Sequence, residues 1–324
     1  MTARDVREVG VFLLIAFGLS WLIALPLWLG DGLLSPWFGL VALAMMFTPG
    51  IAATIVVFFV ERPPAKARAL GLWPLRPAGR FVRHLALGLV VPVVLVVGAI
   101  LVGALLGVYP ADFVRFSAFQ QALDQQLAAA GVPDVPVPVQ LLVVLQLVNI
   151  LFAAFINLVP ALGEEVGWRG WLLPKLMPLG AVPAILVSGV VWGLWHAPLI
   201  LLGYNYPGAP GWLAVLMMTG MCVLVGAVFG WLRLRSESVW PAALAHGAFN
   251  AAANATLVLF AAAGEPIDTT QATILGWSGW ILPLVLVAVL VATGRFRPAA
   301  RPLPAASRSM ARASASPPPD AASP

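Results

Sequence analysis

The stretch GEEVGWRGWL, residues 163–172, places two adjacent carboxylates in a chain with only 13 Asp and Glu among 324 residues. On a helix, Glu165 and Arg169 are four residues apart and share a face, with the acid in the favourable N-terminal position. Glu164 is rotated by about 100° and is free for another task. A lone acid–arginine pair would be read as a charged helix end, but one bridge does not need two acids.

Two further polar clusters interrupt apolar runs. In WGLWH, His196 follows Trp192 by one helical turn, and in HGAFN, His246 and Asn250 are four residues apart on one face. Taken singly, each fits a structural role, such as a bond to a carbonyl or an interhelical hydrogen bond. Taken together, a carboxylate, two imidazoles and an amide within lipid are costly unless they face one polar cavity.

This set of groups can support hydrolysis in two ways. A carboxylate such as Glu164 can take a proton from water, while imidazole and amide N–H groups bind the developing oxyanion. Alternatively, Glu164, His196 and His246 could hold a zinc ion with an open position for water. Both alternatives predict that Glu164, His196, His246 and Asn250 converge.

The elements that must position these residues are predicted from long apolar runs. The chain is 61% hydrophobic and 10% charged, whereas ordinary globular proteins have about 25% charged residues. Its solvent must therefore be largely lipid, and the long runs differ from the short alternating strands of barrels. We predict an all-α polytopic membrane protein, a bundle of about eight transmembrane helices around an intramembrane polar cavity, at 9–30, 38–60, 81–107, 140–163, 182–203, 211–232, 239–263 and 276–293.

Loop charges predict the orientation. The loop 61–83 is strongly basic, and further arginines follow the sixth and the last span, so these segments are expected in the cytoplasm. The acidic segments 108–139 and 264–275 are expected outside, which puts both termini in the cytoplasm. The net charge of +5 arises largely from these arginines, and it indicates no nucleic-acid partner.

The domain organisation is simple. Residues 1–296 are predicted to form one integral membrane domain, and the Ala/Pro/Ser/Arg-rich segment 297–324 a disordered cytoplasmic tail. Residues 111–131 are predicted to include a helix lying on the outer leaflet. The Ala/Arg/Pro/Trp-rich composition is typical of a GC-rich bacterial genome, which would make the location a bacterial inner membrane.

Several other hydrolase patterns are missing from the sequence. It has no HExxH zinc motif, no pair of intramembrane aspartates, and no serine in a rhomboid-type setting, since Ser188 lacks the GxSG context. The single Cys222 excludes an intramolecular disulfide and a multi-cysteine metal site. Intramembrane hydrolysis would therefore depend on the Glu/His/His/Asn set.

At these residues the chain resembles a known family. EEVGWRGWL, WGLWH and HGAFN are similar to the EExxxR, FxxxH and HxxxN motifs of the CPBP (CAAX protease and bacteriocin-processing, or Abi) intramembrane proteases, of the CAAX prenyl protease 2 type. The resemblance covers about residues 140–260. Each motif alone is weak, but three in the same order on separate spans are specific. Trp192 stands where the family usually has phenylalanine, which keeps an aromatic side chain.

The resemblance implies an eight-helix bundle whose polar cavity opens toward the cytoplasm. It implies endopeptidase activity on a membrane-anchored peptide or protein, which could be a prenylated CAAX-type substrate. In this chain Glu164 would be the water-activating base, His196 would help to hold the water, and His246 with Asn250 would form the oxyanion pocket.

The resemblance also implies supporting residues. Glu165 and Arg169 would pair with each other in support of the site, and Trp192 would be a further supporting residue. The family has been described both as metalloproteases and as metal-independent glutamate proteases, so zinc remains an open alternative.

Two other function classes remain open from the sequence. The polar residues of a transporter or permease line a substrate path, but the first half of this chain has no counterpart to the Glu/His/Asn set. A non-catalytic membrane scaffold or immunity protein could use the same fold, although all the acid, histidine and asparagine positions of the motifs are present.

Overall fold

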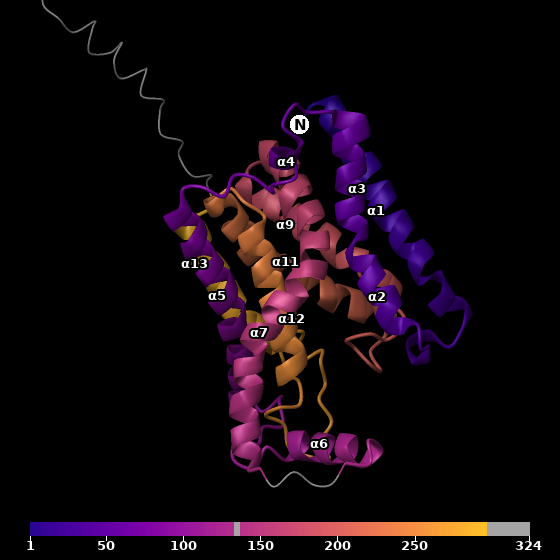
Figure 1. Ribbon diagram of the computed structural model, residues 1–324, viewed down its shortest axis with the longest axis vertical. Coiled ribbons are helices and arrows are strands. Elements are labelled where there is room, and N and C mark those ends of the chain that lie inside the picture. Colours follow the sequence, from indigo (N-terminus) through magenta and orange to yellow (C-terminus); the bar gives the residue numbers. More distant parts are fainter. Residues whose placement is uncertain (133–136, 297–324) are drawn as a thin grey trace, which may run out of the picture.

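The computed structural model describes residues 1–132 and 137–296, and these are folded into helices (Figure 1). Within these ranges no strand is present, and one isolated antiparallel bridge joins Ala111 to Ala261. Five helical segments are long and apolar enough to cross a membrane: α1 (Ala3–Leu29), Phe38–Glu61, α5 (Ala78–Leu105), Val139–Leu179 and α11 (Gly211–Ser236). The prediction of a polytopic helical membrane protein is confirmed.

The other three predicted spans correspond to shorter helices. They are α9 (Ala181–Trp195), α12 (Trp240–Thr256) and a segment that combines η5 (Trp277–Trp280) with α13 (Ile281–Ala292). The predicted span 182–203 is interrupted, because α9 ends at Trp195 and a separate short helix, α10 (Ala197–Ile200), begins after His196. The predicted tail 297–324 lies outside the described residues, and the cytoplasmic placement of the termini stays a prediction.

The helical segment of the fourth predicted span extends beyond residue 163. The segment runs on through α7 (Val139–Glu165), the π-helix η3 (Val166–Leu172), α8 (Leu173–Leu176) and η4 (Met177–Leu179). The sequence suggested an end because charged residues begin at Glu164. Their charges are instead paired inside the protein, so the helix continues through them.

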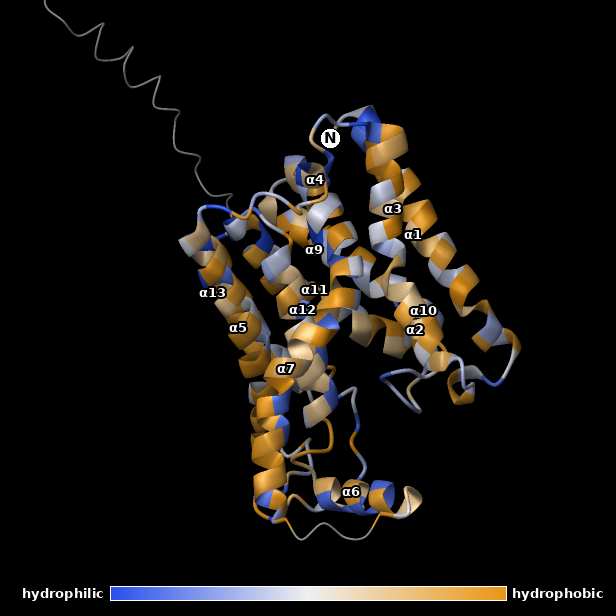
Figure 2. Ribbon diagram, viewed as in Figure 1, coloured by the Kyte–Doolittle hydropathy of each residue, from blue (hydrophilic) through white to orange (hydrophobic). Residues whose placement is uncertain are grey.

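Helices α11 and α12 form the centre of the bundle. α12 packs against α7 and α5, and α11 packs against α9 (Figure 1). Small residues allow this close approach: a Cβ added to Gly189 or Gly193 of α9 would collide with the backbone of Val223 or Thr219. The outward faces of α5 and α7 are mostly apolar (Figure 2), as expected of lipid-facing helices.

The helix α6 (Ser117–Ala129) lies across one end of the bundle (Figure 1). Asp112 fixes its start, since its carboxylate accepts hydrogen bonds from the Ser117 hydroxyl at 2.7 Å and from the Arg115 backbone at 2.9 Å. These hydrogen bonds, that of the hydroxyl above all, lower the pKa of Asp112 to about 2. A surface helix in this segment was predicted from the sequence, and its transverse direction agrees with that prediction.

A group of charged side chains joins α1 to the other helices at the opposite end. Lys175 of α8 lies 2.7 Å from Glu8 Oε2 of α1 and 2.9 Å from Glu61 Oε1. Glu61 ends the π-helix η2 (Val56–Glu61), which continues α2 (Phe38–Met46) and α3 (Thr48–Ile55). We call Lys175, Glu8 and Glu61 the rim clasp. Arg4 adds a 2.8 Å ion pair to Glu8, and Trp171 donates to Glu61 at 2.9 Å.

Candidate active site

The acidic doublet lies within a widened part of the long helical segment. Glu164 and Glu165 end α7, and the chain continues as the π-helix η3. Glu164 is 2% exposed, Glu165 0% and Arg169 1%, so this is no charged helix end at a membrane surface. Single π-turns within helices are rare and frequently occur at functional sites.

Glu165 joins two helices through one oxygen atom. Its Oε1 accepts from Arg169 Nη1 at 2.6 Å and lies 3.0 Å from His246 Nδ1 on α12. An ionised carboxylate can only accept, so the hydrogen in this contact belongs to His246 Nδ1. The predicted pairing of Glu165 with Arg169 is present, whereas the contact with His246 was missed.

Arg169 is held between aromatic rings. Its guanidinium carbon lies 4.2 Å from the Trp192 ring centroid and 5.4 Å from that of Phe229. Gly226 of α11 makes room for it, since a Cβ there would lie 2.5 Å from Arg169 Nη2. In the part of the chain that the structure describes, Nη2 and Glu165 Oε2 find no hydrogen-bond partner.

Glu164 has a different partner. Its Oε2 accepts a hydrogen bond of 2.7 Å from Trp192 Nε1 on α9. The phenylalanine usual at this position in the similar family has no N–H to donate. The Trp192 ring also packs edge-on against His246, with the ring centroids 5.3 Å apart. The substitution therefore adds a bond to the proposed base, which the aromatic match in the sequence did not reveal.

His196 occupies the break between α9 and α10. Its Nδ1 lies 2.9 Å from the backbone oxygen of Trp192, and since a carbonyl can only accept, this Nδ1 carries the hydrogen. Trp195 packs against the imidazole with ring centroids 4.8 Å apart, and the Trp195 indole donates to Ser20 of α1 and to Thr48 of α3. In a neutral His196 ring, Nε2 is then free to accept a hydrogen bond.

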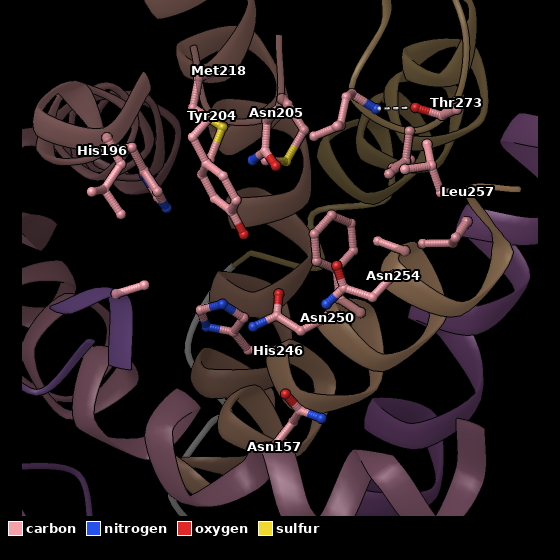
Figure 3. A pocket seen from close by; sticks show the side chains of 18 of the residues that line it. Asn157, His196, Tyr204, Asn205, Met218, His246, Asn250, Asn254, Leu257 and Thr273 are labelled. Atoms are coloured by element: carbon pink, nitrogen blue, oxygen red, sulfur yellow. Dashed lines mark hydrogen bonds between the residues drawn. The ribbon is translucent and has the colours of Figure 1, made fainter. Parts of the chain in front are cut away.

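These residues surround one cavity of about 260 Å³. Figure 3 shows His196 and His246 on two sides of the space, with the Tyr204 hydroxyl pointing into it. Glu165 and Arg169 are not among the lining residues and lie behind Glu164 and His246. The sequence missed Tyr204 and Asn205 because they lie in the loop after α10. The polar lining consists of Asn157, Glu164, Trp192, His196, Tyr204, Asn205, His246, Asn250, Asn254, Thr256 and Thr273.

A zinc site does not fit this arrangement well. Within residues 1–132 and 137–296, no three His, Cys, Asp or Glu side chains are grouped as ligands of one metal ion would have to be. The hydrogen bonds of Glu164 Oε2 and of Nδ1 of each histidine leave Glu164 Oε1 and the two Nε2 atoms as the atoms that a metal ion could still bind. The groups share a cavity without converging on one point.

The comparisons with known proteins match the same region. Residues 146–252 match the family described as "Type II CAAX prenyl endopeptidase Rce1-like". A 53-residue stretch is 38% identical to the CAAX prenyl protease 2 of Methanococcus maripaludis, and this covers 16% of the chain and 20% of that protein. The family match therefore covers about a third of the chain, the part that carries Glu164, His196, His246 and Asn250.

Proposed function

We propose that this chain, whose residues 146–252 match the Rce1-like CAAX protease family, is an intramembrane endopeptidase that cleaves membrane-anchored peptides. One observation carries the proposal. Glu164 of α7, His196 after α9, and His246 and Asn250 of α12 come from three parts of the sequence and line a single cavity inside a helical membrane protein. Such groups are costly within lipid and mark functional sites.

The hydrogen bonds made by Glu164 and His196 suggest how a water molecule is activated. Trp192 holds Glu164 Oε2 and leaves Oε1 to accept a proton from water. His196 Nε2 accepts the other hydrogen of that water, because Nδ1 is committed to the Trp192 carbonyl. The resulting hydroxide attacks the scissile carbonyl carbon, and the proton on Glu164 passes to the leaving amine when the C–N bond breaks.

The oxyanion of the tetrahedral intermediate needs hydrogen-bond donors of its own. Asn250 supplies its amide N–H, and His246 supplies Nε2–H when the ring is doubly protonated. Glu165 accepts from His246 Nδ1 at 3.0 Å and so fixes the orientation of the imidazole ring.

Turnover by the purified full-length protein in lipid nanodiscs tests this function. The probe is a quenched fluorescent peptide with a farnesylated cysteine near its C-terminus, measured beside the same peptide without the farnesyl group. Glu164→Gln should lower the rate by about 10²–10⁴-fold, whereas Asp124→Asn on the exposed face of α6 should not change it. Equal rates for Glu164→Gln and the unmodified protein would reject the proposed base. A preference for the farnesylated peptide would assign a prenylated substrate.

We also propose that the reaction proceeds without a metal ion. The ligand geometry supports this, since the described His, Cys, Asp and Glu side chains form no group that could hold one. Dialysis against a chelator should leave the rate within about twofold, the range expected when no metal-activated water is lost. Loss of activity that zinc restores would overturn the metal-free route but leave the peptidase assignment intact.

A further inference from the structure

The cavity continues past the proposed catalytic groups along α12. His246, Asn250 and Asn254 follow one another at intervals of four residues, and all three line the cavity (Figure 3). Asn254 belongs to none of the three sequence motifs. Its position one turn beyond Asn250 extends the polar face away from His246.

The amides on this face are open to a ligand. Asn157, which lines the same cavity from α7, donates to the Ala153 carbonyl of its own helix at 2.9 Å. Asn250 and Asn254, by contrast, make no side-chain hydrogen bond to any residue that the structure describes. Asn254 is exposed and Asn250 is partly exposed, so a ligand can reach both amides. Each amide offers two N–H donors and an acceptor oxygen.

The spacing of these amides matches an extended peptide. Four residues of helix rise by about 6 Å, and two residues of an extended strand advance by about 6.4–6.8 Å. Asn250 and Asn254 can therefore address main-chain groups two residues apart, which point in the same direction. Lipid tails and isoprenoid chains have no N–H or C=O groups with which to pair.

Apolar side chains share the lining of this cavity with the amides. They include Val96 and Ile100 of α5, with Leu257 and Ile274. Such a lining suits apolar side chains on the bound peptide.

We infer that Asn254 is a substrate-positioning residue, which holds the main chain of an extended apolar peptide two residues from the carbonyl group that occupies the Asn250 pocket. The inference rests on the proposed function and names a subsite of that same site. It adds a main-chain contact that neither the three motifs nor the family match assigns.

The first test separates binding from chemistry. Asn254→Leu removes the amide at similar size and should raise KM for the fluorescent peptide by about tenfold, the equivalent of one or two hydrogen bonds, with kcat within about twofold. Asn149→Leu of α7 is the matched control, because Asn149 is not among the residues that line the cavity, and its KM should stay within about twofold. An unchanged KM in Asn254→Leu overturns the inference.

A second test does not depend on turnover. A dansyl-labelled decapeptide of alanine and leucine is bound to the Glu164→Gln protein, and each of its amides is replaced in turn by an ester, which removes one N–H. An ester at one position should weaken binding by about fivefold to tenfold, and this loss should disappear in Glu164→Gln/Asn254→Leu.

The outcomes distinguish the two proposals. Absence of any ester position whose effect depends on Asn254 overturns the subsite, even if the peptide is cleaved. Binding that depends on Asn254 without Glu164-dependent cleavage supports the subsite and rejects the endopeptidase.

Discussion

Two carboxylate clusters lie at either end of the π-helix η3, and they use similar residue types differently. In the rim clasp, Lys175 reaches Glu8 and Glu61, and both acids have further donors in Arg4 and Trp171. Lys175 is 18% exposed, so part of the clasp reaches solvent. Glu8 and Glu61 are both paired with Lys175, and these ion pairs join α1, η2 and α8.

The core cluster is arranged in the opposite way. Arg169 is committed to Glu165, and Glu164 receives only the indole N–H of Trp192 and faces the cavity. Glu165 Oε2 and Arg169 Nη2 have no partner among the described residues. A fully paired cluster at the rim fastens helices, whereas the incompletely paired core cluster keeps one carboxylate available for chemistry.

The largest expected difference between the clusters comes from removing the buried cation. Arg169→Met leaves Glu165 charged and without its 2.6 Å partner in a fully buried site, and it should lower the free energy of unfolding by about 3–5 kcal/mol. Thermal unfolding in nanodiscs measures this loss. The double variant Glu165→Gln/Arg169→Met should recover much of the stability, because no unpaired charge remains. If the single variant were as stable as the unmodified protein, Arg169 could not be neutralising Glu165.

A smaller effect is expected from crowding the guanidinium group. Gly226→Ala puts a methyl group 2.5 Å from Arg169 Nη2 and should cost about 2 kcal/mol of stability, as overpacked cores do. Gly230→Ala, one turn later on α11, meets a methyl group of Leu173 at 3.3 Å and Ile185 at 3.7 Å and serves as the control. Equal melting temperatures for the two variants would show that the space beside Arg169 is not limiting.

The two tryptophans provide a matched pair, since each donates its indole N–H to a glutamate. Trp192→Phe removes the bond to Glu164 and should lower kcat by about tenfold, or about 1.4 kcal/mol, with KM unchanged, because the base loses its fixed orientation. Trp171→Phe removes the 2.9 Å bond to Glu61 in the rim clasp and should leave kcat within about twofold. Peptide cleavage by both variants measures the difference. Similar losses in both would contradict the division of roles.

The sequence predicted the core cluster better than the rim clasp, for a physical reason. Glu164, His196 and the His246–Asn250 pair stand out because lipid-embedded spans seldom contain such residues. Glu8, Glu61 and Lys175 lie near the ends of spans, where charges are ordinary, so nothing in the sequence linked residues 167 positions apart. Helix spacing predicted the Glu165–Arg169 pair, but it carries no information on contacts between helices, such as Glu165 with His246.

Hydropathy also ends the fourth predicted span at residue 163, although the helical segment continues beyond it. A hydropathy pattern treats Glu164, Glu165 and Arg169 as independent costs and ends the span before them. In the folded protein these groups compensate one another, and His246 and Trp192 complete the arrangement. Compensation of this kind depends on tertiary structure, and so does the cavity that Asn205 and Tyr204 complete from a loop.

The smallest effect is expected at the rim. Lys175→Met should lower the free energy of unfolding by about 1 kcal/mol, because the ammonium group is partly solvated and Arg4 still pairs with Glu8. Salt screens partly solvated pairs more than fully buried ones, so the difference from the unmodified protein should shrink as the salt concentration rises, while the cost of Arg169→Met should not. Peptide cleavage by Lys175→Met should stay within about twofold of the unmodified rate. A loss of cleavage as large as that in Glu164→Gln would mean that the rim clasp also controls the cavity, and that the two clusters act as one unit.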